Sequence, residues 1–90
     1  MGHTIKDKKR ILARVNRLKG QLEALATAVE ADQDCYKIMQ LLASCRGALH
    51  GLMGDIINNH IREHIVEAAN KTDASKAGDE LIEIMESFWK

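Results

Sequence analysis

The sequence has no proline and only six glycines among its 90 residues. Because proline breaks helices and glycine weakens them, their scarcity favours long helices over strands or turn-rich folds. Aromatic residues are also rare, at 3% of the chain, although hydrophobic residues make up 46%. A chain this short buries only a small core by itself, and sharing a core between subunits is a common remedy. We therefore expect one all-α domain, residues 1–90, that forms an oligomer.

A long apolar run is also missing. No stretch approaches the roughly 20 residues that a membrane-spanning helix needs. The first ten residues, MGHTIKDKKR, are polar and charged, unlike a secretion signal. The two cysteines, Cys35 and Cys45, stand ten residues apart, a spacing typical of neither a zinc ribbon nor a redox motif. We expect a cytoplasmic protein with no membrane partner, whose cysteines are thiols.

Two long segments carry apolar residues at helical spacing. In the first segment these residues are Ile11, Val15, Leu18, Leu22, Leu25 and Val29. Thr4 and Asp7 form a capping signal at the start of this helix. The segment EADQD, residues 30–34, predicts a turn in which Asp32 or Asp34 caps a second helix. The apolar residues of the second helix are Ile38, Leu41, Leu42, Cys45, Leu49, Leu52, Met53, Ile56, Ile57 and Ile61.

Three glycines, Gly47, Gly51 and Gly54, lie inside this second helix. Each costs about 1 kcal/mol relative to alanine in a helix interior. They indicate either a break in the helix or a small-residue face that another helix approaches closely. Because the apolar spacing keeps its phase through the glycines, we favour a continuous helix that runs to about Val66.

The remaining chain predicts a loop and one short helix. We interpret NKTDASKAGD, residues 70–79, as the loop. The helix after it has a narrow apolar face formed by Leu81, Ile82, Ile84, Met85 and Phe88. The protomer is then a long antiparallel hairpin plus a short C-terminal helix. Two long helices cannot close a core alone, so a dimer that pairs two hairpins into a four-helix bundle is the simplest assembly.

His60 and His64 stand four residues apart, which places them on one face of the second helix and suits two metal ligands. The segment HIREH also matches the H-x-x-E-H pattern of a group of zinc peptidases, in which Glu63 would be the general base. On a helix, however, Glu63 projects about 100° away from His64. A long helix in so short a chain also offers little cleft for a peptide. We therefore do not expect an enzyme.

Hairpin geometry brings further donors toward these two histidines. With the turn near residue 31 or 32, residue i lies beside residue 63 − i, within about a turn, which places His3 beside His60. The amine of Gly2 lies one residue from His3 if Met1 is removed. Cys35 stands 25 residues before His60, roughly 38 Å away along a helix, so it can join only from an antiparallel partner subunit. Amine, imidazole and thiolate donors suit borderline divalent metals.

Charge is unevenly distributed, although the formal net charge is zero. The first 20 residues hold seven basic residues and one acid, a net charge of +6, and the other 70 residues carry −6. The basic residues at helical spacing are Lys6, Arg10, Arg14 and Arg17, and Arg46 is expected beside Arg17 on the second helix. Such a cluster suits phosphate contacts with double-stranded DNA. No helix-turn-helix or zinc-finger pattern is present, so a broad helical face would bind.

The blocks KDKKRILARVNRLKGQLEAL, RGALHGLM and NNHIREHI, with the cysteine at position 35, resemble the CsoR/RcnR/FrmR family of bacterial repressors over almost the whole chain. The resemblance implies an all-α dimer that assembles to a tetramer. The effector-free form would bind operator DNA, and effector binding would release it and derepress an efflux or detoxification operon. By the same resemblance, the residues that contact DNA are Arg10, Arg14, Arg17 and Arg46.

Members of this family differ in their sensing residues. Copper(I) sensors use a Cys-His-Cys set, and the matching positions here, Cys35, His60 and His64, lack the second cysteine. Nickel/cobalt sensors use an N-terminal histidine, a cysteine and two histidines. This sequence supplies that full set as His3, Cys35, His60 and His64. The resemblance therefore implies a nickel/cobalt-responsive repressor, with zinc or copper as other candidate ions.

Two alternatives remain open. Formaldehyde sensors of the family combine the same cysteine with the N-terminal residue, usually proline, and have a glutamate where His64 stands. Because Cys35 and an N-terminal amine are both present, a formaldehyde-responsive repressor is one alternative. The other is a cytoplasmic metal-buffering protein that does not bind DNA. The sequence does not choose among nickel, cobalt and zinc, because selectivity among them comes from site geometry.

Overall fold

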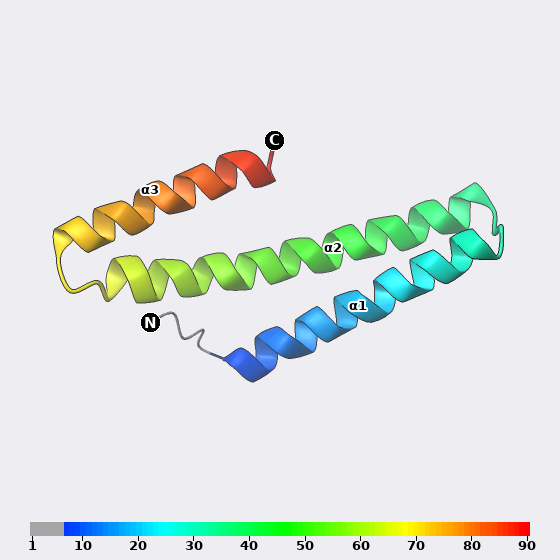
Figure 1. Cartoon of the computed structure of the whole chain (residues 1–90), viewed down its shortest axis with the longest axis horizontal. Coiled ribbons are helices and arrows are strands. Elements are labelled where there is room, and N and C mark those ends of the chain that lie inside the picture. Colours follow the sequence, from blue (N-terminus) through cyan, green and yellow to red (C-terminus); the bar gives the residue numbers. More distant parts are fainter. Residues whose placement is uncertain (1–6) are drawn as a thin grey trace. The chain divides into compact units, whose positions relative to one another are not determined.

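The structure is a computed structural model of the whole chain, and it describes residues 7–90. Over these residues the chain is helical without strands, in the order α1 (Lys8–Glu30), α2 (Cys35–His60), the π-helical segment η1 (Ile61–Val66) and α3 (Lys71–Phe88) (Figure 1). The all-α prediction of three helices is confirmed. The described chain divides into two compact units, Asp7–Met53 and Gly54–Lys90.

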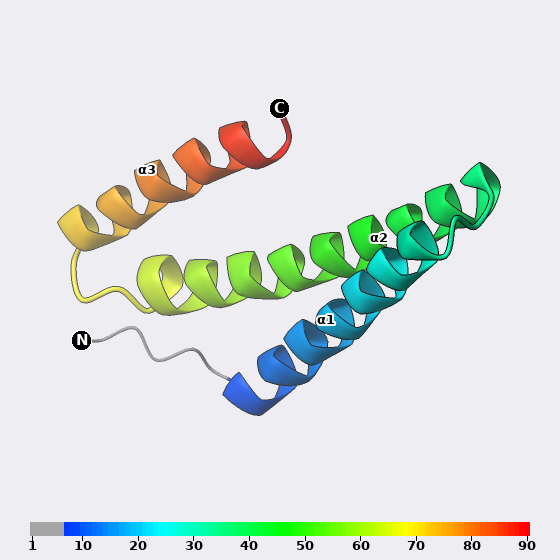
Figure 2. The ribbon, with the colours of Figure 1, turned by 45° about the vertical axis from the view of Figure 1, so that its right-hand side comes forward.

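The unit Asp7–Met53 is a helical hairpin, in which α1 and the first part of α2 run antiparallel (Figure 1, Figure 2). Gln21 Nε2 donates a hydrogen bond to Ser44 Oγ at 3.2 Å. Closer to the start of α1, the guanidinium of Arg14 lies against Gly51 of α2. In both pairs the two residue numbers add up to 65. Residue i of α1 therefore lies beside residue 65 − i of α2, two residues from the expected 63 − i. This difference is smaller than one helical turn, the error expected for the prediction.

The turn after α1 depends on one residue in the left-handed region. Asp32 has φ 54°. Its N–H donates to the carbonyl of Val29 at 3.1 Å, and the N–H of Gln33 donates to the carbonyl of Ala28 at 3.0 Å. This pair of hydrogen bonds is the Schellman arrangement, which normally has glycine at the left-handed position. Asp32 therefore ends α1, and it does not cap α2.

The structure confirms a predicted cap at the start of α2 but not the one predicted for α1. Asp34 Oδ1 accepts from the N–H of Lys37 at 2.9 Å, so Asp34 is the cap of α2, as one of the two predicted options. By contrast, α1 begins at Lys8, and Asp7 before it has φ 56° and makes no side-chain capping bond. The prediction that Asp7 completes a capping pair with Thr4 is wrong, because Asp7 lies before the helix; Thr4 itself lies outside the described residues.

Helix α2 is continuous through its three glycines, as the apolar spacing predicted. A methyl group added to Gly47 or Gly54 would meet no atom within 4 Å. The same group on Gly51 would lie 2.8 Å from Nη1 of Arg14. Among the residues that the structure describes, therefore, no second helix packs closely on Gly47 or Gly54, and Gly51 faces the Arg14 side chain.

In the unit Gly54–Lys90, α3 turns back and packs against η1 (Figure 1). The prediction of a loop over residues 70–79 is wrong, because α3 begins at Lys71. Asn70 caps this helix. Its side-chain oxygen accepts from the N–H of Asp73 at 2.8 Å, and its amide nitrogen donates to the Asp73 carboxylate at 3.2 Å. This cap and the bond between the two side chains, together with the burial of Ala77, stabilise a helix start in a polar segment.

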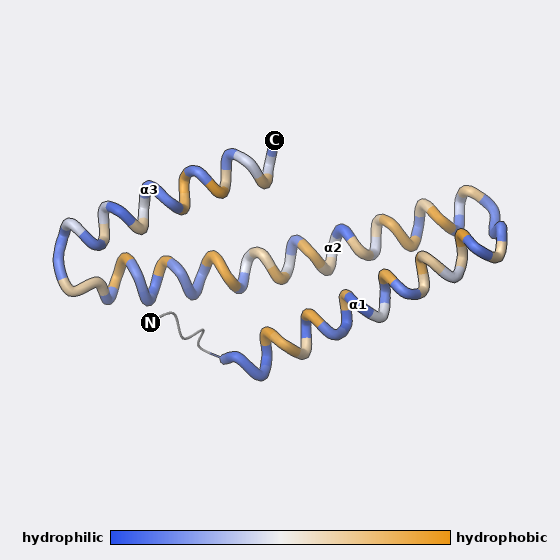
Figure 3. Tube along the Cα trace, viewed as in Figure 1, coloured by the Kyte–Doolittle hydropathy of each residue, from blue (hydrophilic) through white to orange (hydrophobic). Residues whose placement is uncertain are grey.

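Few side chains are buried. In the described part of the chain the buried residues are Ile11, Ala28, Cys45 and Ala77, which confirms Cys45 as a core residue. Apolar residues recur along α1 and α2 (Figure 3), yet large ones such as Leu22, Met39 and Leu42 are about half exposed, at 48%, 59% and 55%. None of the described helices combines the length and the apolar character needed to span a membrane.

Candidate functional site

The two histidines of HIREH lie at the junction where α2 changes into η1. The α-helix ends at His60, and the π-helical segment begins at the next residue. The N–H of Glu67 donates to the carbonyl of Arg62 at 2.9 Å, five residues back, as a π-helix requires. The rings of His60 and His64 lie with centroids 5.1 Å apart and planes inclined by 47°. Their predicted convergence is confirmed, but the sequence carried no signal for the π-helix.

A hydrogen bond to α3 fixes the orientation of one ring. His60 Nε2 lies 2.9 Å from the carbonyl oxygen of Ala77. Because a carbonyl only accepts, Nε2 carries the proton and donates it. In the neutral imidazole the lone pair is then on Nδ1. Histidines that bind metals commonly donate their second N–H to a backbone carbonyl in this way. The His60 ring therefore presents Nδ1 as its candidate ligand atom.

Both histidines face a half-open pocket at this junction. Its other charged side chains are Glu63, Glu67, Asp73, Lys76 and Glu80. Even so, within the part of the chain that the structure describes, no group of three or more His, Cys, Asp or Glu side chains is arranged to hold a metal ion. The described residues thus contribute two converging imidazoles.

The structure does not place the other predicted ligands beside these histidines. Cys35 is the first residue of α2, whereas His60 is the last residue of the same helix. The Cys35 thiol is exposed and forms no disulfide. His3 and Gly2 lie outside the described residues. Cys35 is therefore accessible to a second molecule at the opposite end of α2 from the histidine pair.

The predicted DNA-binding arginines all belong to the hairpin unit. Arg10 and Arg17 on α1 are exposed, as is Arg46 on α2, whereas Arg14 is half-buried. At about 100° per residue, Arg10, Arg14 and Arg17 share one face of α1. Arg46 also borders an apolar groove formed with Leu18, Leu22, Met39, Leu42, Ala43, Cys45 and Leu49. One face of α1 therefore presents a row of three arginines.

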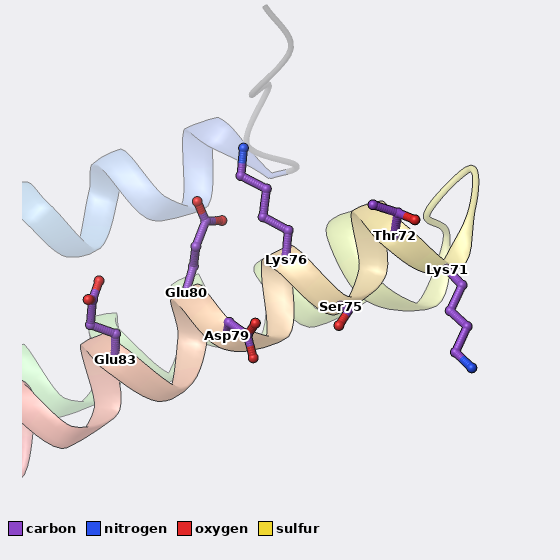
Figure 4. Close-up of a pocket in the computed structure, with 7 residues that line it drawn as sticks. All are labelled: Lys71, Thr72, Ser75, Lys76, Asp79, Glu80 and Glu83. Carbon is purple, nitrogen blue, oxygen red and sulfur yellow. The ribbon is translucent and has the colours of Figure 1, made fainter.

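Another surface depression runs along α3, and it has the character of a solvated helix face. It is lined by Lys71, Thr72, Ser75, Lys76, Asp79, Glu80 and Glu83. The side chains of Lys76 and Glu80 project on one side of the helix and Lys71 on the other (Figure 4). These residues include no histidine or cysteine and come from one helix only, so we assign no site to them.

Comparison with known proteins places the chain in a family. Residues 7–87 match the family model described as "Metal-sensitive transcriptional repressor". A protein encoded in the bioA 5′ region of Serratia marcescens is 41% identical, and the transcriptional repressor RcnR of Salmonella paratyphi B is 33% identical; each match covers 100% of both chains.

Solved structures agree with this assignment. A Glu-to-His variant of the formaldehyde-responsive regulator FrmR from Salmonella enterica serovar Typhimurium superimposes with a TM-score of 0.85 at 35% identity, covering 97% of this chain and 99% of that one. The nickel-responsive transcriptional regulator InrS gives a TM-score of 0.75 at 25% identity, with 98% and 99% covered. The chain belongs to the metal-sensitive transcriptional repressors of the CsoR/RcnR family, and it is a transcriptional regulator rather than an enzyme.

Proposed function

We propose that this protein is a nickel/cobalt-responsive repressor of the cytoplasm. Its effector-free form binds operator DNA, and nickel or cobalt binding releases the DNA and derepresses metal-efflux genes. The observation that carries the proposal is the convergence of His60 and His64, whose ring centroids are 5.1 Å apart. Histidine at position 64 supplies a nitrogen ligand where the resemblance gives formaldehyde sensors a glutamate.

The proposed ligand set is His3, His60 and His64 of one chain with Cys35 of the partner subunit, and the Gly2 amine is a further candidate. Three observations support it: the lone pair on His60 Nδ1, the exposed Cys35 thiol, and the presence of only two converging imidazoles in the described chain. Imidazole and thiolate donors suit nickel, cobalt and zinc better than magnesium or calcium. When bound, the ion would link the N-terminal segment to α2 and to a second subunit.

The assembly proposed for this site is the four-helix-bundle dimer, which pairs further into a tetramer. The apolar groove of the hairpin supports it, because residues such as Leu22, Met39 and Leu42 are too exposed for a stable lone protomer. In an antiparallel pair, the start of one α2 reaches the end of the other. The partner's thiol can then lie near the histidine pair.

We propose double-stranded operator DNA as the partner of the basic face, through Arg10, Arg14, Arg17 and Arg46. The exposure of three of these arginines and the +6 charge of the first 20 residues support this assignment. His3 precedes the basic residues of α1 in the same N-terminal part of the chain, so fixing the position of His3 can redirect those residues. Release then follows from a population shift, which requires different metal affinities in the two conformers.

The test of this proposal is a cobalt(II) titration of the reduced, tag-free protein, followed by absorption spectroscopy beside Cys35→Ala. We expect a thiolate charge-transfer band in the wild type that is lost in the variant, with the weak ligand-field bands of a six-coordinate ion. Intense tetrahedral bands would favour a zinc-type or copper-type site instead. A wild-type spectrum that does not change on addition of cobalt would exclude Cys35 as a cobalt ligand.

Formaldehyde sensing is the second candidate, favoured by the similarity to the FrmR variant and by the exposed Cys35 thiol. In this reaction the thiol and the N-terminal amine would each bond to the formaldehyde carbon, and the carbonyl oxygen would leave as water. Mass spectrometry after formaldehyde treatment would then detect a one-carbon bridge between residue 2 and Cys35.

The alternative of a metal-buffering protein that does not bind DNA is tested by gel retardation. Such a protein would not retard promoter DNA at any salt concentration.

A further inference from the structure

We propose that Gly51 is a positioning residue that seats the guanidinium of Arg14 for contact with DNA. The inference deepens the proposed function, because it depends on Arg14 contacting operator phosphates. It assigns a role to one particular glycine of α2, and it explains why a side chain is absent there.

The contact is specific to one of the three glycines of this helix. A methyl group on Gly51 would lie 2.8 Å from Arg14 Nη1, whereas one on Gly47 or Gly54 would meet nothing within 4 Å. The gap at Gly51 is therefore filled by the end of an arginine side chain from α1. The two residues fit the same register as the hydrogen bond between Gln21 and Ser44.

Arg14 also differs from its neighbours on the basic face. Arg10 and Arg17 are exposed, but Arg14 is half-buried. Its side chain crosses from α1 to α2, so the guanidinium is held between the two helices. An arginine held by its surroundings loses less rotamer freedom when it binds phosphate than one that moves freely in water. Arg14 is thus the member of the row that is already oriented before DNA arrives.

Replacing Gly51 by alanine would displace this guanidinium without damaging the fold. The approach of 2.8 Å involves the far end of a flexible side chain, which can move away from a methyl group. Alanine is also the better helix former. The Gly51→Ala protein should therefore fold, with Arg14 displaced.

The experiment compares Gly51→Ala, Gly47→Ala, Arg14→Ala and the double variant Arg14→Ala/Gly51→Ala with the wild type, all without metal. Binding to a labelled duplex from upstream of the protein's own gene is measured by fluorescence anisotropy at several salt concentrations, and thermal unfolding is followed by circular dichroism. Gly47→Ala is the matched control, because it makes the same change one turn away in open space.

We expect Gly51→Ala to weaken DNA binding about three- to tenfold and to lower the salt slope by up to about 0.9, the loss of one phosphate contact, with no fall in Tm. Gly47→Ala should bind like the wild type. In the Arg14→Ala background, Gly51→Ala should have no further effect. Wild-type binding by Gly51→Ala, or an equal loss in both backgrounds, would overturn the role of Gly51 and leave the repressor proposal intact. A wild-type protein that binds no DNA would overturn both.

Discussion

At the scale of single residues, the two histidines of the candidate site have different surroundings. His60 is anchored through Nε2 to the carbonyl of Ala77, so α3 orients its ring. The ring of His64 lies beside it across the start of the π-helix. Changing either imidazole therefore removes a proposed ligand atom without removing a buried core residue.

His64→Ala should weaken nickel affinity at least about tenfold, since ligand losses exceed the 10- to 100-fold effects of outer-shell changes, while DNA binding without metal stays as in the wild type. Competition with a chromogenic chelator measures the affinity. His50→Ala is the matched control, because His50 is a half-buried histidine of the same helix that we do not assign to the site. Equal nickel affinity in His64→Ala and the wild type would exclude His64 as a ligand.

The spacing of His60 and His64 predicted their convergence, because residues four apart share a helical face. The same spacing could not reveal the change from α- to π-helix, which is a property of the backbone. Nor could it reveal the bond to Ala77, since that depends on where α3 returns. The proposed ligand role of Cys35 stays a prediction, because the structure describes one chain and the proposed site needs a second subunit.

At the scale of elements, the connection between α1 and α2 depends on a non-glycine residue in the left-handed region. Asp32 has φ 54°, and aspartate tolerates this conformation better than most residues because it has a short polar side chain that can bond to nearby backbone. The sequence EADQD predicted a turn here, but composition alone could not decide which aspartate ends α1 and which caps α2.

Asp32→Val should destabilise the protein by about 1–2 kcal/mol, since a β-branched residue is strained at positive φ. Urea unfolding at fixed protein concentration measures the change. Asp32→Gly is the control, and it should be at least as stable as the wild type because glycine adopts this conformation freely. Equal destabilisation by valine and glycine would show that the side chain of Asp32 matters more than its backbone conformation.

The start of α3 lies inside the segment that was predicted to be a loop. The polar segment NKTDASKAGD has a loop-like composition, yet Asn70 caps a helix of 18 residues and its side chain also bonds to the Asp73 carboxylate. The N-x-x-D spacing was a signal that the sequence contained. What it did not contain was the packing of α3 on η1, which buries Ala77.

Asn70→Ala should cost about 1 kcal/mol, the usual effect of losing a helix N-cap, and should raise hydrogen exchange in the first turn of α3. Hydrogen exchange followed by mass spectrometry localises the effect. Asn70→Ser is the control, because serine also caps helices and should keep most of the protection. Unchanged exchange in Asn70→Ala would mean that packing on η1 alone fixes the start of α3.

At the scale of the whole molecule, the described residues of the protomer form only a small core. The described chain buries four residues, while the groove between α1 and α2 leaves several large apolar side chains half exposed. The length and composition of the sequence predicted this small core, and the oligomer that we expect from it stays a prediction. A single domain over residues 1–90 stays a prediction, as does the arrangement of the subunits.

Leu42→Glu should prevent assembly, because Leu42 lies in the groove and a charge buried there would be unpaired. We expect a smaller species in analytical ultracentrifugation, with lower helix content because the released hairpin has little core. Gln40→Glu is the control, since Gln40 is exposed and is not among the residues that form the groove. An unchanged oligomer in Leu42→Glu would mean that the hairpins do not assemble through this face.

A DNA-release titration tests whether nickel or cobalt removes this protein from its operator. The reduced, metal-free protein is bound to a labelled duplex from upstream of its own gene, and anisotropy is followed as nickel, cobalt, zinc or formaldehyde is added. We expect release by nickel and cobalt near one ion per site, and loss of that response in His64→Ala. Release by formaldehyde alone, with the complex intact in nickel and cobalt, would exclude a nickel/cobalt-responsive repressor.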